Sequence, residues 1–293
     1  MPIFKGVCTA MITPFKDSAV DTHAFSALID RQLGAGVDAI LVCGTTGEPC
    51  TMSDDEKLTL IQQAAEKINK KVPLIVGVGG NCTGSVATFA RVVRAVGADA
   101  ILSVTPYYNK CTQEGLIRYY SEIAMATDLP IIVYNVPSRT GFNVLPETVE
   151  KLTRIPNVVG IKEASSSISQ AGEILSLCKG KIDFYTGNDD MIVPTMALGG
   201  AGCISVVSNI APQLVVDMVR NVQDFNMCEA AAIQLKLIPL IKAMFSEVNP
   251  IPVKAASSLL GLCRNELRLP LTQLSPANTK IMCAELDKLG IVG

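Results

Sequence analysis

The sequence contains no tryptophan and a single histidine, His23. A Ser-His-Asp triad would have to use His23, and a metal site with several histidine ligands is impossible. None of the ten cysteines form a C-x-x-C pair, and they are scattered through apolar segments, as small hydrophobic residues are in a reducing cytosol. We therefore expect a cytoplasmic protein with no metal site and no cysteine nucleophile.

Excess charge of either sign is also missing. Lys and Arg number 25 against 27 Asp and Glu, a net charge of −2, which argues against a nucleic-acid-binding surface. Residues 191–216 carry no charge and are long enough to span a membrane. Because prolines and glycines interrupt them, they are better explained as a helix, a turn and a strand. The N-terminus has no apolar signal-peptide core. We expect neither a nucleic acid nor a membrane as partner.

Short apolar runs alternate with helical patterns along the chain. Each run is apolar at successive residues, as in parallel strands buried on both faces. Between them lie patterns such as Ser53 and Glu56, a capping box before an amphipathic helix. The eight clearest runs are Val7–Ile12, Ala39–Val42, Leu74–Val78, Ala100–Val104, Ile131–Tyr134, Val158–Ile161, Ile182–Tyr185 and Cys203–Val207.

Eight parallel strands joined by helices predict an α/β fold, a (β/α)8 TIM barrel. We expect the barrel to occupy residues 1–225 and a C-terminal α-helical extension to occupy residues 226–293. A doubly wound dinucleotide-binding sheet is the alternative. It would require G-x-G-x-x-G after the first strand, and residues 7–15 contain no such loop.

Active sites of such barrels lie at the C-terminal ends of the strands. Lys162 ends the sixth strand, where a desolvated amine facing a carbonyl compound could form a Schiff base. The alternative is a solvated charge or an ion-pair partner of Glu163. Tyr134 ends the preceding strand at the same height and could relay a proton, or it could be a tyrosine of the core with a satisfied hydroxyl.

Two further loops carry groups suited to anions. Thr45 and Thr46 lie in a glycine-flanked loop whose amides and hydroxyls could hold a carboxylate, although a tight turn would have the same residues. Arg139 is the only cation in its loop, and a guanidinium binds a carboxylate through two hydrogen bonds. An exposed surface arginine is the alternative for Arg139.

These residues belong to motifs that resemble the dihydrodipicolinate synthase family of Schiff-base aldolases, a superfamily that includes N-acetylneuraminate lyase. The resemblance covers essentially the whole chain, starting at Gly6-Val-x-Thr-Ala-x-Ile-Thr-Pro-Phe15. Its other motifs are Gly44-Thr-Thr-Gly-Glu48, Thr105-Pro-Tyr-Tyr-Asn109, Tyr134-Asn-Val-Pro-Ser-Arg-Thr-Gly141 and Gly160-Ile-Lys-Glu163.

The resemblance implies the first committed step of diaminopimelate and lysine biosynthesis, in which pyruvate condenses with L-aspartate-4-semialdehyde. Lys162 would bind pyruvate as an imine, with no other cofactor. Tyr134, Thr45 and Tyr108 would relay protons, with Tyr108 reaching the neighbouring subunit's site in a dimer of dimers. The remaining family positions contact substrate: Thr46 would bind the pyruvate carboxylate, Arg139 that of the semialdehyde, and Gly187 and Ile204 would line the pyruvate pocket.

Two other functions stay open. Related aldolases that act on keto-sugar acids or hydroxy-oxoglutarate keep the lysine and the tyrosine, although Arg139 favours the semialdehyde. A non-catalytic barrel that serves as a binding or scaffold protein would form no imine.

One departure from the family concerns feedback regulation. Members inhibited by lysine hold this effector near the dimer interface with histidines on the helix after Gly-Thr-Thr-Gly-Glu and with a later glutamate. The matching positions here are Asp54, Lys57 and Ser85, whereas Asn81 and Tyr107 are retained. Lys57 would put a like charge beside the effector's ammonium, so we expect weak or absent inhibition.

Overall fold

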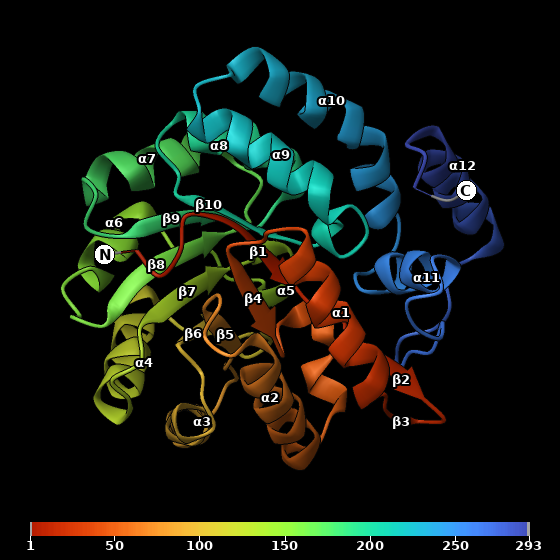
Figure 1. Ribbon diagram of the computed structural model, residues 1–293. Coiled ribbons are helices and arrows are strands. Elements are labelled where there is room, and N and C mark those ends of the chain that lie inside the picture. Colours follow the sequence, from red (N-terminus) through yellow and green to blue (C-terminus); the bar gives the residue numbers. More distant parts are fainter. Residues whose placement is uncertain (1, 292–293) are drawn as a thin grey trace.

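The computed structural model describes residues 2–291 (Figure 1). Within this range eight parallel strands close into a barrel, in which neighbours along the chain are neighbours in space. The predicted TIM barrel is confirmed, and each predicted apolar run coincides with one strand to within a few residues. The strands are β1 (Gly6–Ala10), β4 (Ala39–Val42), β5 (Leu74–Gly77), β6 (Ala100–Val104), β7 (Ile131–Asn135), β8 (Val158–Glu163), β9 (Asp183–Thr186) and β10 (Gly202–Ser205).

Helices surround this barrel. The capping box at the start of α2 is formed as predicted, because Ser53 Oγ accepts from Glu56 N at 3.2 Å and Glu56 Oε2 accepts from Ser53 N at 2.9 Å. The helices between the strands and after the last strand are α1 (Thr22–Gly34), α2 (Asp54–Ile68), α3 (Thr83–Ala95), α4 (Gln113–Ala126), α5 (Pro137–Thr140), α6 (Pro146–Leu152), α7 (Ile168–Cys178), α8 (Ile192–Ala197) and α9 (Pro212–Gln223).

A small hairpin of β2 (Phe15–Lys16) and β3 (Ala19–Val20) follows β1 and was not predicted. Strands of two residues are too short to show a hydrophobic period.

The strands bury both faces. One cluster of buried side chains comes from strand positions such as Cys8, Leu41, Ile132 and Ile204 and contains no residue of α1–α9, so it fills the barrel interior. The other strand positions join the helices in a second, larger cluster. Continuous apolar runs, rather than alternating ones, are the sequence signature of this burial on both sides.

A helical C-terminal part follows the barrel, consisting of α10 (Met227–Met244), α11 (Ile251–Leu259) and α12 (Pro276–Lys288). Three residues at helical spacing face the core from α10: Leu237 and Ile241 are buried, and Ile233 is partly buried and packs against the core. The boundary that we predict near residue 225 lies between α9 and α10. Helix α10 packs against α9 across this boundary, so the chain is not visibly separated there. The division into two domains stays a prediction.

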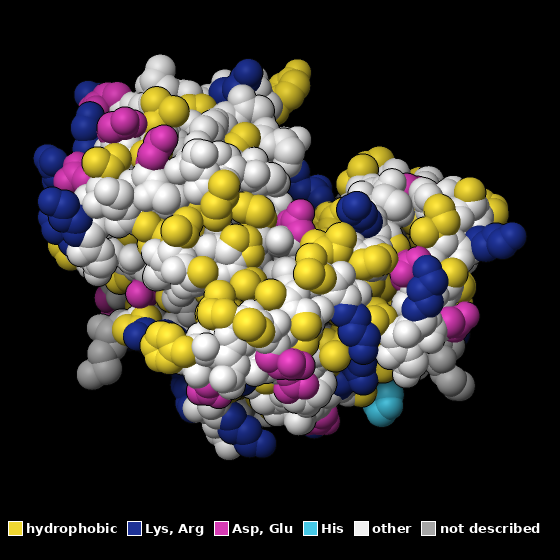
Figure 2. All heavy atoms as spheres, turned by 90° about the horizontal axis from the view of Figure 1, so that it is seen from above, with side chains coloured by type: hydrophobic (Ala, Val, Ile, Leu, Met, Phe, Trp, Pro, Cys, Tyr) yellow, Lys and Arg dark blue, Asp and Glu magenta, His cyan; other side chains and the backbone are white. Residues whose placement is uncertain are grey.

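Seen from the side of α8 to α10, α11 and α12 form a lobe beside the barrel with a hollow between the two, whereas α10 lies over α9 (Figure 1 and Figure 2). On this face Lys and Arg side chains are interspersed with Asp and Glu, in keeping with the net charge of −2. Among the helices described, none has the length and apolar character needed to cross a membrane.

Candidate active site

Lys162 and Tyr134 lie side by side at the C-terminal ends of two paired strands. The register of β7 with β8 places Tyr134 opposite Lys162, and that of β8 with β9 places Lys162 opposite Tyr185. Lys162 is 5% exposed, and its Nζ lies 4.4 Å from the centroid of the Tyr134 ring. The expectation that both residues stand at the same height is met.

Lys162 has no carboxylate partner. None of the ion pairs formed within residues 2–291 includes it. Glu163 instead accepts from Asn135 Nδ2 at 2.9 Å and from the backbone N of Ser165 at 2.6 Å. Both alternatives for Lys162, a solvated charge and a partner of Glu163, are therefore wrong. A buried amine without a counter-ion is the arrangement that imine-forming enzymes use.

Gly187 makes room for the lysine side chain. A Cβ at this position would lie 2.8 Å from Lys162 Cε and 2.9 Å from Ala164 Cβ, closer than carbon atoms can approach. The Gly187 amide donates to the Glu163 carbonyl at 2.7 Å, which keeps the loop after β9 against the end of β8. On the adjoining strand β10, Ile204 is fully buried in the same interior cluster as Tyr134.

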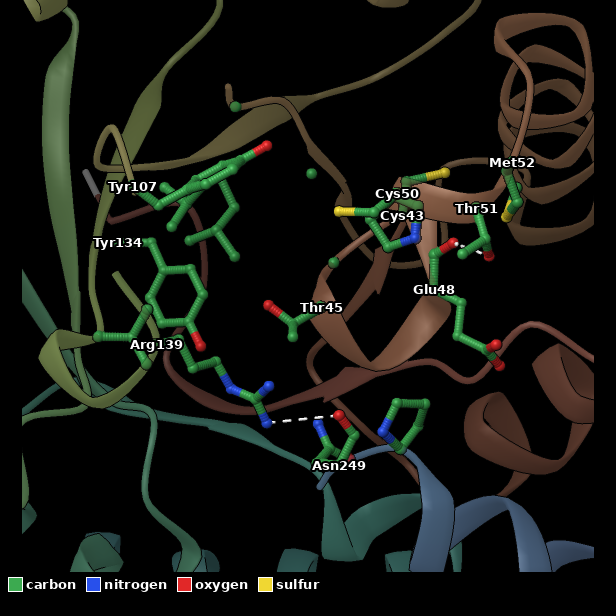
Figure 3. A pocket seen from close by; sticks show the side chains of 18 of the residues that line it. Cys43, Thr45, Glu48, Cys50, Thr51, Met52, Tyr107, Tyr134, Arg139 and Asn249 are labelled. Carbon is green, nitrogen blue, oxygen red and sulfur yellow. Dashed lines mark hydrogen bonds between the residues drawn. The ribbon is translucent and has the colours of Figure 1, made fainter. Parts of the chain in front are cut away.

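The threonine loop follows β4 as one tight turn over Thr45–Gly47. The Gly47 amide donates to the Gly44 carbonyl at 2.8 Å, and Thr13 Oγ1 donates to the Gly47 carbonyl at 2.7 Å. Thr45 lines a cavity of about 510 Å³ that Tyr134 and Arg139 also line. The hydroxyls of Thr45 and Tyr134 point toward one another in this cavity (Figure 3).

Asn249, which was not among the residues predicted from the sequence, joins this cavity from outside the barrel. Its Nδ2 donates to Thr46 Oγ1 at 3.0 Å, and its backbone carbonyl accepts from Arg139 Nη2 at 3.4 Å. Its Oδ1 is buried, and no described residue binds it. Because the Thr46 hydroxyl accepts from Asn249, its own proton remains free to be donated to a ligand.

Arg139 stands at the mouth of the cavity on the short helix α5. The residue is exposed, and none of its described neighbours supplies a carboxylate to it. Figure 3 shows its side chain extending toward Asn249 across the opening. Its guanidinium is therefore available for an anionic ligand.

Of the predicted catalytic residues, Thr45 and Tyr134 line the cavity and Lys162 lies beside Tyr134, whereas Tyr108 does not line the cavity of its own chain. Its side chain is 86% exposed, and its backbone is left-handed with φ of 62°. The preceding residue, Tyr107, lines the cavity instead and is held by Asn81, which accepts from the Tyr107 amide at 3.0 Å. Backbone geometry thus directs these adjacent tyrosines to different places.

A thiol also borders the cavity, at Cys43. Burial raises the pKa of this thiol to about 12, and the nearby Lys57 ammonium only partly opposes the shift. Since the thiolate is the reactive form of cysteine, Cys43 is protonated at neutral pH and is no competitor to Lys162 as the nucleophile.

The fit of Gly187 around Lys162 leads to a prediction. Gly187→Ala should displace the lysine side chain and slow borohydride trapping of pyruvate on Lys162 by about a hundredfold, because small misplacements of reacting groups have effects of this size. Gly84→Ala, where a Cβ has no neighbour within 4 Å, is the matched control. Trapping rates that are equal in the two variants would contradict the prediction, provided circular dichroism shows that both are folded.

Comparisons with known proteins identify the family of this chain. Residues 3–288 match the model of the dihydrodipicolinate synthetase family. The 4-hydroxy-tetrahydrodipicolinate synthase of Caldicellulosiruptor saccharolyticus is 49% identical over 99% of both chains. The crystal structure of dihydrodipicolinate synthase from Thermotoga maritima has a TM-score of 0.98 at 43% identity, over 99% of this chain and 100% of that one.

A third similar protein is the dihydrodipicolinate synthase of Acinetobacter baumannii, whose structure contains pyruvate. It has a TM-score of 0.96 at 37% identity, over 98% of this chain and 99% of the other. The family match spans nearly all of the barrel and the C-terminal helices. The chain belongs to the dihydrodipicolinate synthetase family.

Proposed function

We propose that the chain catalyses the 4-hydroxy-tetrahydrodipicolinate synthase reaction, the condensation of pyruvate with L-aspartate-4-semialdehyde that commits carbon to diaminopimelate and lysine biosynthesis. The observation that carries the proposal is the buried Lys162 without a counter-ion, beside Tyr134 and next to a cavity with an unpaired Arg139. Relatives that carry this activity in their names, and the pyruvate complex of one structural neighbour, support it.

Lys162 acts as the nucleophile. Its neutral amine adds to the keto carbon of pyruvate, and loss of water leaves an imine. Removal of a methyl proton gives the enamine, whose carbon attacks the aldehyde of the second substrate and forms the new carbon–carbon bond. The amine of that substrate then attacks the imine carbon, which closes the ring and releases the Lys162 amine. The covalent imine serves as the electron sink, so no separate cofactor is needed.

Hydroxyl groups carry the protons of these steps. Tyr134 and Thr45 face one another in the cavity and form one part of the relay. Tyr108 of a second subunit supplies the remaining hydroxyl across a dimer interface, within a dimer of dimers. The exposure of Tyr108, which does not line the cavity of its own chain, supports this role.

The two carboxylates bind at separate places. Thr46, whose hydroxyl is oriented by Asn249, binds that of pyruvate, with Gly187 and Ile204 lining the pyruvate pocket. Arg139 at the cavity mouth binds that of the semialdehyde, which distinguishes this substrate from a polyhydroxylated sugar tail. All ten cysteines are free, which supports a cytoplasmic location.

The covalent step is tested by treating the protein with pyruvate and borohydride before mass spectrometry. We expect a reduced pyruvyl adduct on Lys162 of the native protein and none on Lys162→Ala, which should retain the fold. Lys151→Ala, which removes an exposed lysine, is the control and should be modified normally. An unmodified native chain would support a non-catalytic barrel, and turnover of keto-sugar acids but not of the semialdehyde would support the alternative aldolases.

The relay across subunits is tested by mixing two inactive variants. Tyr108→Phe should assemble normally in sedimentation and lose most of its activity, and Lys162→Ala should be inactive. After subunit exchange, the Tyr108 of a Lys162→Ala subunit completes the site of a Tyr108→Phe subunit, so activity should return. A mixture that exchanges subunits and stays inactive would place Tyr108 outside the neighbouring site.

Feedback inhibition by lysine should be weak. Lys57 lines the cavity, where its ammonium would repel that of the effector, and Ser85 supplies no carboxylate. A lysine titration of the native enzyme should leave most activity, whereas the Lys57→His/Ser85→Glu variant should gain sensitivity. Strong inhibition of the native enzyme at low lysine concentration would refute this expectation.

A further inference from the structure

A buried ion pair lies behind the threonine loop. Lys254 on α11 binds Glu48, the last residue of the Gly44–Glu48 motif, and both side chains are completely shielded from solvent. The Glu48 side chain points away from the hydroxyls of Thr45 and Tyr134 (Figure 3), so its carboxylate is not placed for chemistry on the substrate. The pair joins the C-terminal helices to the loop after β4.

Stability alone does not explain this pair. Burying two charges has a large desolvation cost, and apolar side chains of similar size are often equally stable or more so. Burial lowers the pKa of Lys254, and the Glu48 carboxylate opposes this shift. The Lys254 ammonium also lies 4.2 Å from the centroid of the Phe15 ring. What a buried pair supplies, and an apolar contact does not, is a defined direction and distance.

The backbone of Glu48 transmits this geometry to the threonines. Glu48 is left-handed, with φ of 54°, and its amide donates to the Thr45 carbonyl at 3.2 Å. The second carboxylate oxygen accepts from the Arg268 amide at 3.2 Å. Moving the side chain of Glu48 therefore moves the end of the turn that contains Thr45 and Thr46.

Further contacts from the same C-terminal region hold the chain on either side of Glu48. Arg268 Nη1 donates to the Thr51 carbonyl at 2.8 Å, and its guanidinium pairs with Glu56. Asn249 binds the Thr46 hydroxyl. The segment from Thr46 to Glu56 is thus fastened at several points to residues 249–268, which lie outside the barrel.

We propose that Glu48 and Lys254 are positioning residues for pyruvate, which hold Thr45 and Thr46 at the distance from Lys162 that the keto acid requires. The inference rests on the proposed function and extends it to the C-terminal helices. The C-terminal helices contribute to catalysis by keeping the threonine loop in place. Neither Glu48 nor Lys254 contacts the substrate.

The test compares a variant that removes the charge of one partner in the ion pair with a variant that removes the charges of both. Lys254→Met leaves the Glu48 carboxylate buried without a cation and should lower both the thermal midpoint and the affinity for pyruvate. In Glu48→Gln/Lys254→Met no buried charge remains, so the thermal midpoint should recover. The pyruvate KM of this double variant should still be raised about tenfold or more, because the loop has lost its fixed position.

A control variant and the second substrate distinguish an effect on pyruvate binding from a general effect on the enzyme. Arg94→Met removes an exposed ion pair with Asp128 at the C-terminal end of α3 and should leave the thermal midpoint and the pyruvate KM unchanged. The KM for the semialdehyde should change by less than about twofold in the double variant, because Arg139 is not held by Glu48. Glu48→Gln alone serves if neither methionine variant accumulates, and its pyruvate KM should also rise.

The inference would be overturned if the folded double variant had the native pyruvate KM, or if Glu48→Gln had it where the double variant does not accumulate. The ion pair would then have only a structural role. That result differs from failure of the proposed function, in which the native protein and Arg94→Met would themselves form no imine with pyruvate.

Discussion

The closure of eight parallel strands into a barrel fixes where the site can form. Because all strands run in the same direction, their C-terminal ends meet at one mouth, whatever the distance between them along the chain. The register between β7 and β8 then decides which side chains are neighbours there. Shifting it by one residue would turn Lys162 out of the interior, since adjacent strand residues face opposite sides.

The cations in and around the site differ in whether a carboxylate pairs with them. Lys162 is buried beside the Tyr134 ring and Arg139 is exposed, and within residues 2–291 no carboxylate forms an ion pair with either of them. Lys254 is buried as well, but it is occupied by Glu48. Two buried lysines in one protein thus have opposite environments: Lys162 lies beside an aromatic ring, and Lys254 is paired with a carboxylate.

Most of the fold could be predicted because its signals are local. Continuous apolar runs and the capping box at Ser53 depend only on neighbouring residues, and the strands they predict are those observed. The hairpin of β2 and β3 was not predicted because strands of two residues are too short to show a hydrophobic period. The sequence predicted four candidates because each stands at or shortly after the C-terminal end of a strand, and the structure brings them together at one cavity or beside it: Lys162, Tyr134, Thr45 and Arg139.

Asn249, Lys254 and Arg268 had no such signal. They follow α10, outside the barrel, and no rule of spacing connects them with a loop some two hundred residues earlier. Local patterns in the chain were enough to predict the barrel, the candidate residues at its strand ends and the likeness to a family. Which lysine is free and which is paired follows from the folded structure, because the environment of a charge depends on groups that packing, and not chain order, places around it.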